Sequence, residues 1–332
     1  MHTVSKSQKI SEGDVLPKNW DAIYQGTTWS PETGFPNNHA SLEILDSNSE
    51  KSLSGSGKSA VFWRESLNLG WRNWASDAQL VKLLDQGYDQ LYVEFWIRFS
   101  DDWYGRNEGE FGNWVSKFFR IGSWDEVGDI YNGALGSVGP VFIWDWKRDL
   151  YGVRNQFTYR GGPHGENYDM SNKYPQGESL NFTTNSIGMG INGTDPLILD
   201  RVYGGWLKDF GGRADHNQVF GVGGNWTKMA FYVQMNSAPG VHDGVIRQWI
   251  NGVQSHNRED VPWIGFNTGN KMAKWNYVAI GGNDYFQHYP NEDRYQDWYS
   301  IDNLVVRSDI PLELLSGRAG FAPNPPPEVF VE

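Results

Sequence analysis

The chain has 332 residues, a formal net charge of -12 and no cysteine. An acidic chain lacks the basic footprint that nucleic acids require, and a chain without cysteine has no disulfide, thiol nucleophile or thiolate metal site. No stretch approaches the roughly 18 apolar residues of a membrane helix. We therefore expect neither a nucleic acid nor a membrane as partner.

Aromatic residues make up 15% of the chain, with 17 Trp, 16 Tyr and 17 Phe, although the mean hydropathy is only -0.59. The core of a β-sandwich accounts for many of them. Indole and phenol rings also suit half-wet surfaces, so the remainder favours an aromatic-lined surface for sugar rings. The length is sufficient for one large all-β domain.

In chain order, residues 1–30 read as irregular, and the first regular element is a predicted helix over 76–87. Ser76 can cap it, Gln79 stands at the capping-box position, a leucine stripe follows and Gly87 ends it. This is the only good helix signal in the sequence.

Elsewhere the hydrophobic period is two, as in residues 91–99, where Val93, Phe95, Ile97 and Phe99 alternate with polar or amphipathic residues. Turn signals such as Asp243-Gly244 separate several similar runs. The strands that we expect are 91–99, 114–122, 139–149, 151–161, 226–236, 244–252, 275–282 and 299–308. The pattern predicts an all-β antiparallel β-sandwich, or jelly roll, with one short accessory helix and long loops.

Residues 1–318 read as a single domain, followed by a proline-rich tail over 319–332. Residues 161–225 are rich in Gly, Asn, Asp and Tyr with short apolar runs, which predicts long loops over one end or edge of the sandwich. Loops of this length in a compact domain are more often functional than idle.

The C-terminal third carries a recognisable pattern: a Trp opens a strand that ends on Asn, an Asp-Gly turn follows, and the next strand closes on Trp-x-Asn-Gly. Those positions are Trp226, Asn236, Asp243, Gly244, Trp249, Asn251 and Gly252. The pattern resembles concanavalin A-like lectin/glucanase domains, including jelly-roll polysaccharide lyases. The likeness covers about 226–310, with a weaker match over 88–125, and is specific for the fold, because the superfamily hosts lectins, hydrolases and lyases.

This resemblance implies a polysaccharide or oligosaccharide as partner, and a secreted protein located outside the cell or in the periplasm; we also expect a monomer. The double-carboxylate strand motif of laminarinase-like hydrolases is absent, which favours a polysaccharide lyase that acts by β-elimination on a uronate. Such a lyase needs a group to neutralise the carboxylate, a base and an acid. Jelly-roll lyases typically use Arg, Asn, Gln or His beside a Tyr.

The densest set of such side chains lies in residues 152–168. Alternation assigns Arg154, Gln156 and Arg160 to one face of a strand, and Asn155 and Tyr159 to the other. The predicted catalytic residues are Arg154, Asn155, Gln156, Tyr159, Arg160 and His164. A solvated strand face is the alternative for this composition.

Polar faces of two other strands, together with aromatic residues near the loops, supply candidates for holding sugars. The predicted substrate-binding residues are Glu94, Trp96, Arg98, Trp144, Trp146, Tyr168, Lys228, Tyr232 and Gln234. Tyr159, Trp206 and Trp263 are further stacking candidates. Alternatives remain open here: Lys228 facing water, and Glu94 paired with Arg98 as structural support.

Two other functions are compatible with the sequence. A glycoside hydrolase needs two carboxyl groups about 5 to 10 Å apart, for which Glu94 and Asp145 are the candidates. A carbohydrate-binding or adhesion module needs no catalytic group. No cofactor is required for any of these. Domains of this type often carry a structural Ca²⁺, for which Asp302 is the candidate ligand, with a plain turn or strand hydrogen bond as the alternative.

Overall fold

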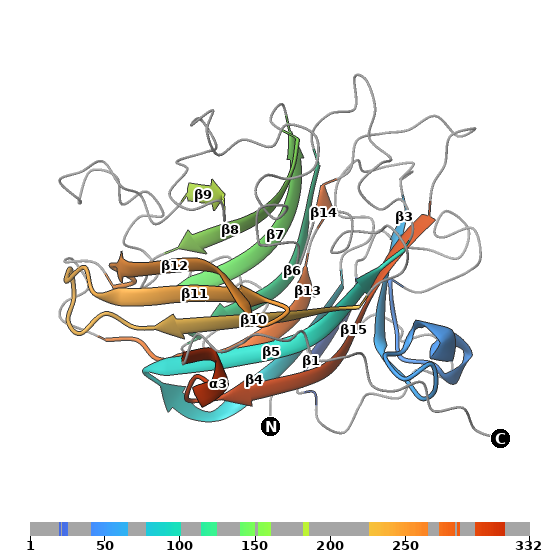
Figure 1. Ribbon diagram of the computed structural model, residues 1–332, viewed down its shortest axis with the longest axis horizontal. Helices are drawn as coiled ribbons and strands as arrows, with labels where there is room; N and C mark the ends of the chain where they lie inside the picture. Colours follow the sequence, from blue (N-terminus) through green and yellow to red (C-terminus); the bar gives the residue numbers. More distant parts are fainter. Residues whose placement is uncertain are drawn as a thin grey trace.

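The computed structural model describes residues 20, 22–25, 41–65, 78–100, 114–124, 140–149, 152–160, 182–185, 226–264, 272–282, 284–285 and 296–315. These residues form two sheets that pack face to face (Figure 1). Every strand pair in the two sheets is antiparallel. The antiparallel β-sandwich expected from the sequence is confirmed.

The first sheet has eight strands in the order β1-β4-β13-β6-β7-β8-β9, with β14 paired to β6. Its strands β6, β7 and β8 bend strongly along their length (Figure 1). The bounds are β1 (Ala22–Gln25), β4 (Ala78–Tyr88), β6 (Trp114–Gly122), β7 (Val141–Asp149), β8 (Gly152–Arg160), β9 (Phe182–Asn185), β13 (Trp275–Gly282) and β14 (Asp284–Tyr285).

The second sheet has seven strands in the order β12-β11-β10-β5-β15-β3-β2. Neighbours such as β5 and β15 are far apart in sequence, as in jelly-roll folds. The bounds are β2 (Leu42–Glu43), β3 (Ala60–Glu65), β5 (Gln90–Phe99), β10 (Thr227–Gln234), β11 (Gly244–Ile250), β12 (Val253–Val261) and β15 (Gln296–Arg307). Short helical turns are η1 (Asp46–Lys51) and α3 (Leu312–Leu315).

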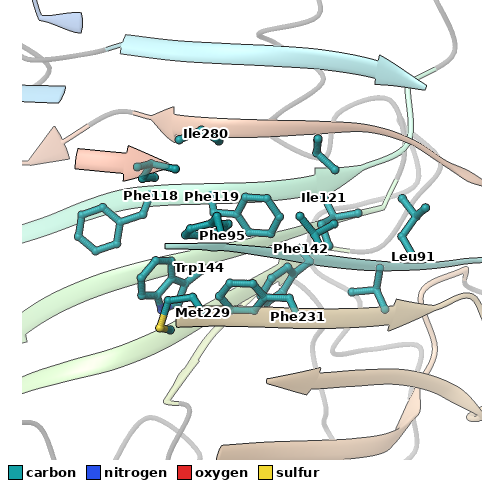
Figure 2. Packing of buried hydrophobic residues seen from close by; sticks show 14 of the residues in the cluster. Leu91, Phe95, Phe118, Phe119, Ile121, Phe142, Trp144, Met229, Phe231 and Ile280 are labelled. Atoms are coloured by element: carbon teal, nitrogen blue, oxygen red, sulfur yellow. The ribbon is translucent and has the colours of Figure 1, made fainter. Parts of the chain in front are cut away.

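The core lies between the two sheets and is largely aromatic (Figure 2). Phe231 of β10 stacks on Phe119 of β6 at 5.1 Å between ring centroids, and Phe95 of β5 lies 6.1 Å from Trp144 of β7. Ring pairs of this kind add roughly 0.5–1.5 kcal/mol each beyond the burial of their area. The core therefore accounts for much of the aromatic content of the chain.

All eight strands expected from the sequence form, but the helix predicted over 76–87 is wrong. Residues 78–88 are strand β4, which pairs with β1 on one side and β13 on the other. Leu80 faces the core, whereas Val81 contacts a second apolar cluster on the opposite side of the sheet. Because both faces of this strand are covered, its apolar residues lose the period of two and imitate helical spacing.

The domain limit at residue 318 and the tail over 319–332 lie outside the described residues, as does most of the loop region predicted over 161–225, of which the structure describes only β9. Among the helices that the structure does describe, none is long and apolar enough to cross a membrane.

Candidate functional site

The outer side of β6, β7 and β8, facing away from the core, carries an excess of basic residues. Phe142 and Trp144 face the core, so alternation assigns Asp145, Lys147 and Asp149 to the outer side of β7. The register then places their cross-strand partners on the same side. The basic residues on this side, here called the basic face, are Lys117, Arg120, Lys147, Arg154 and Arg160.

Arg120 is the best-defined member of the basic face. Its side chain is 1% exposed, and it lies next to the two glycines that end β13. One guanidinium nitrogen donates a long hydrogen bond to the Gly281 carbonyl at 3.4 Å, and the other would lie 2.7 Å from a Cβ built on Gly282. Only glycine leaves room for the guanidinium there, so this stretch of β13 is shaped around Arg120.

Tyr277 lies on the same side of the eight-stranded sheet as Arg120. The register pairs Tyr277 with Gly122, and a Cβ on Gly122 would overlap the phenol ring and its hydroxyl oxygen. The ring therefore crosses directly over β6 toward Val141, the β7 partner of Gly122. This arrangement places a phenol hydroxyl on the basic face.

The Tyr277 hydroxyl is buried and has no hydrogen-bond partner in the part of the chain that the structure describes. Burial raises the pKa of Tyr277 far above its usual value, and the nearby positive charge of Arg120 opposes this only in part. The hydroxyl thus keeps its proton at neutral pH. An unsatisfied buried hydroxyl costs stability, roughly 1–3 kcal/mol, so its presence needs an explanation such as function.

Two further residues frame this part of the basic face. Gln79 of β4 is 7% exposed, and its side-chain oxygen has no partner among the described residues. It is paired in register with Gly281, whose carbonyl accepts the Arg120 hydrogen bond. Trp124 packs beside Tyr277 and makes two hydrogen bonds with the side chain of Asn276. The Trp124 backbone N–H donates to the Asn276 side-chain oxygen at 2.8 Å, and the Asn276 side-chain nitrogen donates to the Trp124 carbonyl at 2.6 Å.

The structure divides the predicted catalytic residues between the two sides of β8. Arg154, Gln156 and Arg160 are on the basic face, opposite Lys147, Asp145 and Val141 respectively. Asn155 and Tyr159 are opposite Trp146 and Phe142, the second of which faces the core. The side chains of these β8 residues, and His164, Tyr168 and Trp206 altogether, lie outside the described part. Their catalytic and binding roles stay predictions.

Most predicted substrate-binding residues lie on the other side of the molecule, on the outer side of the seven-stranded sheet. On β5 the residues Val93, Phe95 and Ile97 face the core, so the alternate residues face outward, as expected. This surface is here called the paired face; it contains Tyr92, Glu94, Trp96, Arg98, Lys228, Tyr232 and Gln234.

Two charged groups of the paired face, Glu94 and Lys228, are bound to each other. The Glu94 carboxylate lies 2.8 Å from the Lys228 ammonium and accepts a 2.5 Å hydrogen bond from Tyr92. Arg98 does not pair with Glu94; it donates to the Glu50 carbonyl at 3.2 Å and lies over an indole ring. The Tyr232 hydroxyl, 2.9 Å from the Gln234 side-chain oxygen, is also engaged.

Because the two faces lie on opposite sides of the core, the predicted catalytic and substrate-binding residues do not line one groove. The same separation removes the proposed hydrolase pair, since Glu94 belongs to the paired face and Asp145 to the basic face. Trp144 and Trp263 are fully buried in the core, so the prediction that they stack on sugars is wrong. Trp146 is described only by its backbone register.

Asp302 makes two backbone hydrogen bonds, from Leu53 N–H at 3.0 Å and from Asn303 N–H at 2.8 Å. These bonds match the alternative of a plain strand or turn contact. Asp302 also lines a pocket of about 210 Å³ beside Trp20 and Lys58. No group of three or more His, Cys, Asp or Glu residues suitable for a metal ion occurs within the described ranges. The structural Ca²⁺ stays a prediction.

Sequence reasoning missed Arg120, Tyr277 and Gln79. The first two stand in strands that were recognised, and alternation from Phe119 and Val278 would have assigned both to the outward side. Their neighbours Gly122 and Gly282 were the available signal, because a glycine inside a strand often marks close approach by another group. Gln79 was hidden by the mistaken helix.

The fold and this site define a jelly-roll sandwich with a basic, partly buried polar surface on its eight-stranded sheet. The antiparallel sandwich is shown by the strand order of its two sheets. The concanavalin A-like type expected from the C-terminal pattern stays a prediction. No protein-family model and no curated protein matches the chain.

Several solved structures are distantly similar. The alginate lyase from Aplysia kurodai is 12% identical at a TM-score of 0.44, with 87% of this chain and 91% of that one covered. A cellulose-induced protein is 10% identical at 0.40, covering 88% and 92%. An alginate lyase mutant in complex with alginate trisaccharide is 10% identical at 0.37, covering 85% and 97%. Similarity this distant says nothing of activity.

Proposed function

We propose that the basic face binds an acidic polysaccharide and that the protein cleaves it by β-elimination. The observation that supports this is the local reversal of charge. The chain has 40 acidic and 28 basic residues, yet the strand register gives five basic residues, and only Asp145 and Asp149 as acidic ones, positions on the outer side of β6 to β8. A local excess of basic residues attracts a polyanion even when the net charge of the protein is negative.

The groups around Arg120 suit the elimination step. The guanidinium neutralises a uronate carboxylate, which makes the proton on the adjacent carbon acidic. A base removes that proton, and the electron pair of the broken C–H bond forms a carbon–carbon double bond. The glycosidic C–O bond breaks, and the leaving oxygen keeps its electron pair. Tyr277 then gives its proton to the leaving oxygen. A phenol is protonated at neutral pH, as this role requires. His164 remains our candidate for the base.

The test is to incubate the protein with a panel of uronate polysaccharides and to follow the ultraviolet absorbance of the unsaturated product, alongside a reducing-sugar assay on neutral polymers. We expect absorbance to rise with at least one uronate polymer. Reducing ends without that absorbance would mean hydrolysis and would overturn the elimination step.

A non-catalytic binding module is the second candidate, because a basic face can hold a polyanion without cleaving it. Affinity gel electrophoresis on the same panel separates the two. Retention on an acidic polymer that weakens with added salt, without any product, would leave binding alone. If no acidic polymer retards the protein, the role of the basic face is wrong.

A further inference from the structure

The paired face contains one aromatic side chain that nothing in the fold uses. Trp96 of β5 is partly exposed. Its side chain makes no hydrogen bond, ring contact or cation–π contact with any residue that the structure describes. Other indoles on this side are engaged: Trp63 and Trp298 are each covered by the Lys51 ammonium at 5.4 and 5.3 Å, and Trp249 is buried beside Tyr92. Trp96 therefore presents an unengaged indole N–H and ring.

The neighbours of Trp96 are hydrogen-bonding groups held in place. Lys228 is directly opposite it on β10 and Asp302 directly opposite it on β15, so their Cβ atoms lie about 4.5–5.5 Å away. Lys228 is fixed by its ion pair with Glu94, and Asp302 by the two backbone N–H groups that it accepts. A flat ring is thus bordered by a fixed cation on one side and a fixed carboxylate on the other.

We infer that Trp96 and its neighbours form a second carbohydrate-binding site, which takes a neutral hexose chain. A sugar ring stacks on the indole, while Lys228 donates to its hydroxyl groups and Asp302 and Glu94 accept from them. We assign a neutral chain because the charges around Trp96 balance: Glu94 neutralises Lys228, and the Asp302 carboxylate is offset by Arg98, two residues along β5 on the same face. A patch without net charge does not select for an acidic sugar.

This site is independent of the proposed elimination activity, since it lies across the core from the basic face. It extends the protein's contacts to a second polymer of different charge. A protein that holds a neutral chain on one side and an acidic chain on the other would be retained where the two polymers occur together, because one attachment raises the local concentration for the other.

The test uses the full chain and two probes, cellohexaose and mannohexaose, with binding measured by calorimetry and by quenching of tryptophan fluorescence. We expect at least one to bind, and Trp96→Ala to weaken that binding about tenfold, as for loss of one aromatic contact with its hydrogen bond. Trp96→Phe keeps a ring without the N–H, so it should weaken binding less than Trp96→Ala does.

Met272→Ala removes an exposed apolar side chain elsewhere and should leave binding unchanged, as a matched control. Binding of neither neutral oligomer, or equal binding by the parent protein and Trp96→Ala, overturns the inference. An acidic uronate oligomer that binds through Trp96 more tightly than both neutral ones overturns the assignment to a neutral chain. Cleavage of acidic polymers at the parent rate by Trp96→Ala shows that the two sites are separate, whereas loss of that cleavage would contradict their independence.

Discussion

The two outer faces of this sandwich contain similar residue types but use them differently. On the paired face most charged and phenolic groups satisfy one another: Glu94 binds Lys228 and Tyr92, although the Arg98 Nε is buried without a partner among the described residues. On the basic face, the Tyr277 hydroxyl and the Gln79 side-chain oxygen are buried without partners among the described residues. Hydrogen bonds made within a surface stabilise the fold, whereas buried groups left unsatisfied reduce stability.

This difference indicates where chemistry takes place. Perturbed, unpartnered groups cluster at functional sites, although structural networks also perturb pKa values. Both faces contain a tyrosine whose pKa is raised by burial, but the hydroxyl of Tyr92 is committed to Glu94, while that of Tyr277 is not bound to a described residue. The comparison supports our proposal that proton transfer takes place on the basic face.

The largest expected effect is that of Tyr277→Phe on cleavage of an acidic polysaccharide. Removal of a general acid lowers kcat by about 10²–10⁴-fold. The free energy of unfolding should not fall, because the Tyr277 hydroxyl makes no hydrogen bond to a described residue. Burying a hydroxyl group without a hydrogen-bond partner is unfavourable, so its removal costs nothing here. Steady-state kinetics and thermal unfolding of the same sample check both statements.

Tyr92→Phe is the matched control on the paired face. It removes an equally buried hydroxyl that is bonded to Glu94, so we expect lower stability, by about 1–2 kcal/mol, and unchanged kcat. The opposite result, with Tyr92→Phe inactive and Tyr277→Phe fully active, would break the division between the two faces.

The sequence predicted the sandwich well because its strands obey local rules. Alternation over 91–99 and 226–236 is visible in the printed sequence, and each run forms a strand with the expected core face. Strand β4 could not be predicted in this way, because covering both its sides removes the alternation. The pairing of strands distant in sequence, such as β5 with β15, also has no local signal.

The same limit explains what happened to the candidate site. Outward polar residues on β5 and β10 were identified correctly as outward, but which sheet holds each strand is decided by long-range pairing. Residues of two opposite surfaces were therefore combined into one groove. Trp144 was misjudged for a related reason: the stretch that follows it in sequence is mostly charged, whereas its neighbours in space are Phe118, Phe95 and Phe231.

The next effect in size concerns Gly122, over which the Tyr277 ring lies. Gly122→Ala places a methyl group in the ring's path, and overpacking of this kind costs typically 1–3 kcal/mol. We expect a lower midpoint in denaturant unfolding and loss of cleavage, because the phenol is displaced. Adding Tyr277→Ala removes the obstacle and should restore part of the stability without the activity. A double variant no more stable than Gly122→Ala would show that the strain lies elsewhere.

A smaller effect is expected on the paired face from Lys51→Ala. The Lys51 ammonium lies over both Trp63 and Trp298, and its removal should cost about 1 kcal/mol of unfolding free energy. The nearby Lys58→Ala is the control: its ammonium is exposed and 3.3 Å from Asp46, and surface pairs contribute roughly 0–1 kcal/mol. Equal losses in the two variants would contradict a special role for the stacked cation.

The smallest effect is a fall of stability at alkaline pH to which a tyrosine on each face contributes, for partly different reasons. Burial raises the pKa of Tyr92 and Tyr277 above the value of about 10 found in unfolded chains. Above that pH the unfolded chain loses phenol protons that the folded chain keeps, so stability is fully present below about pH 10 and falls as pH rises further. Denaturant unfolding at a series of alkaline pH values measures the slope.

Tyr92→Phe and Tyr277→Phe should each reduce the slope with which the free energy of unfolding falls above about pH 10. The hydrogen bond to Glu94 is a further cause of the raised pKa of Tyr92 but not of Tyr277. Glu94→Gln should therefore reduce the contribution of Tyr92 and leave that of Tyr277 intact. If Glu94→Gln leaves the alkaline slope of the parent protein unchanged, the phenol of the paired face is not coupled to its carboxylate, and the contrast between a committed and an uncommitted hydroxyl fails.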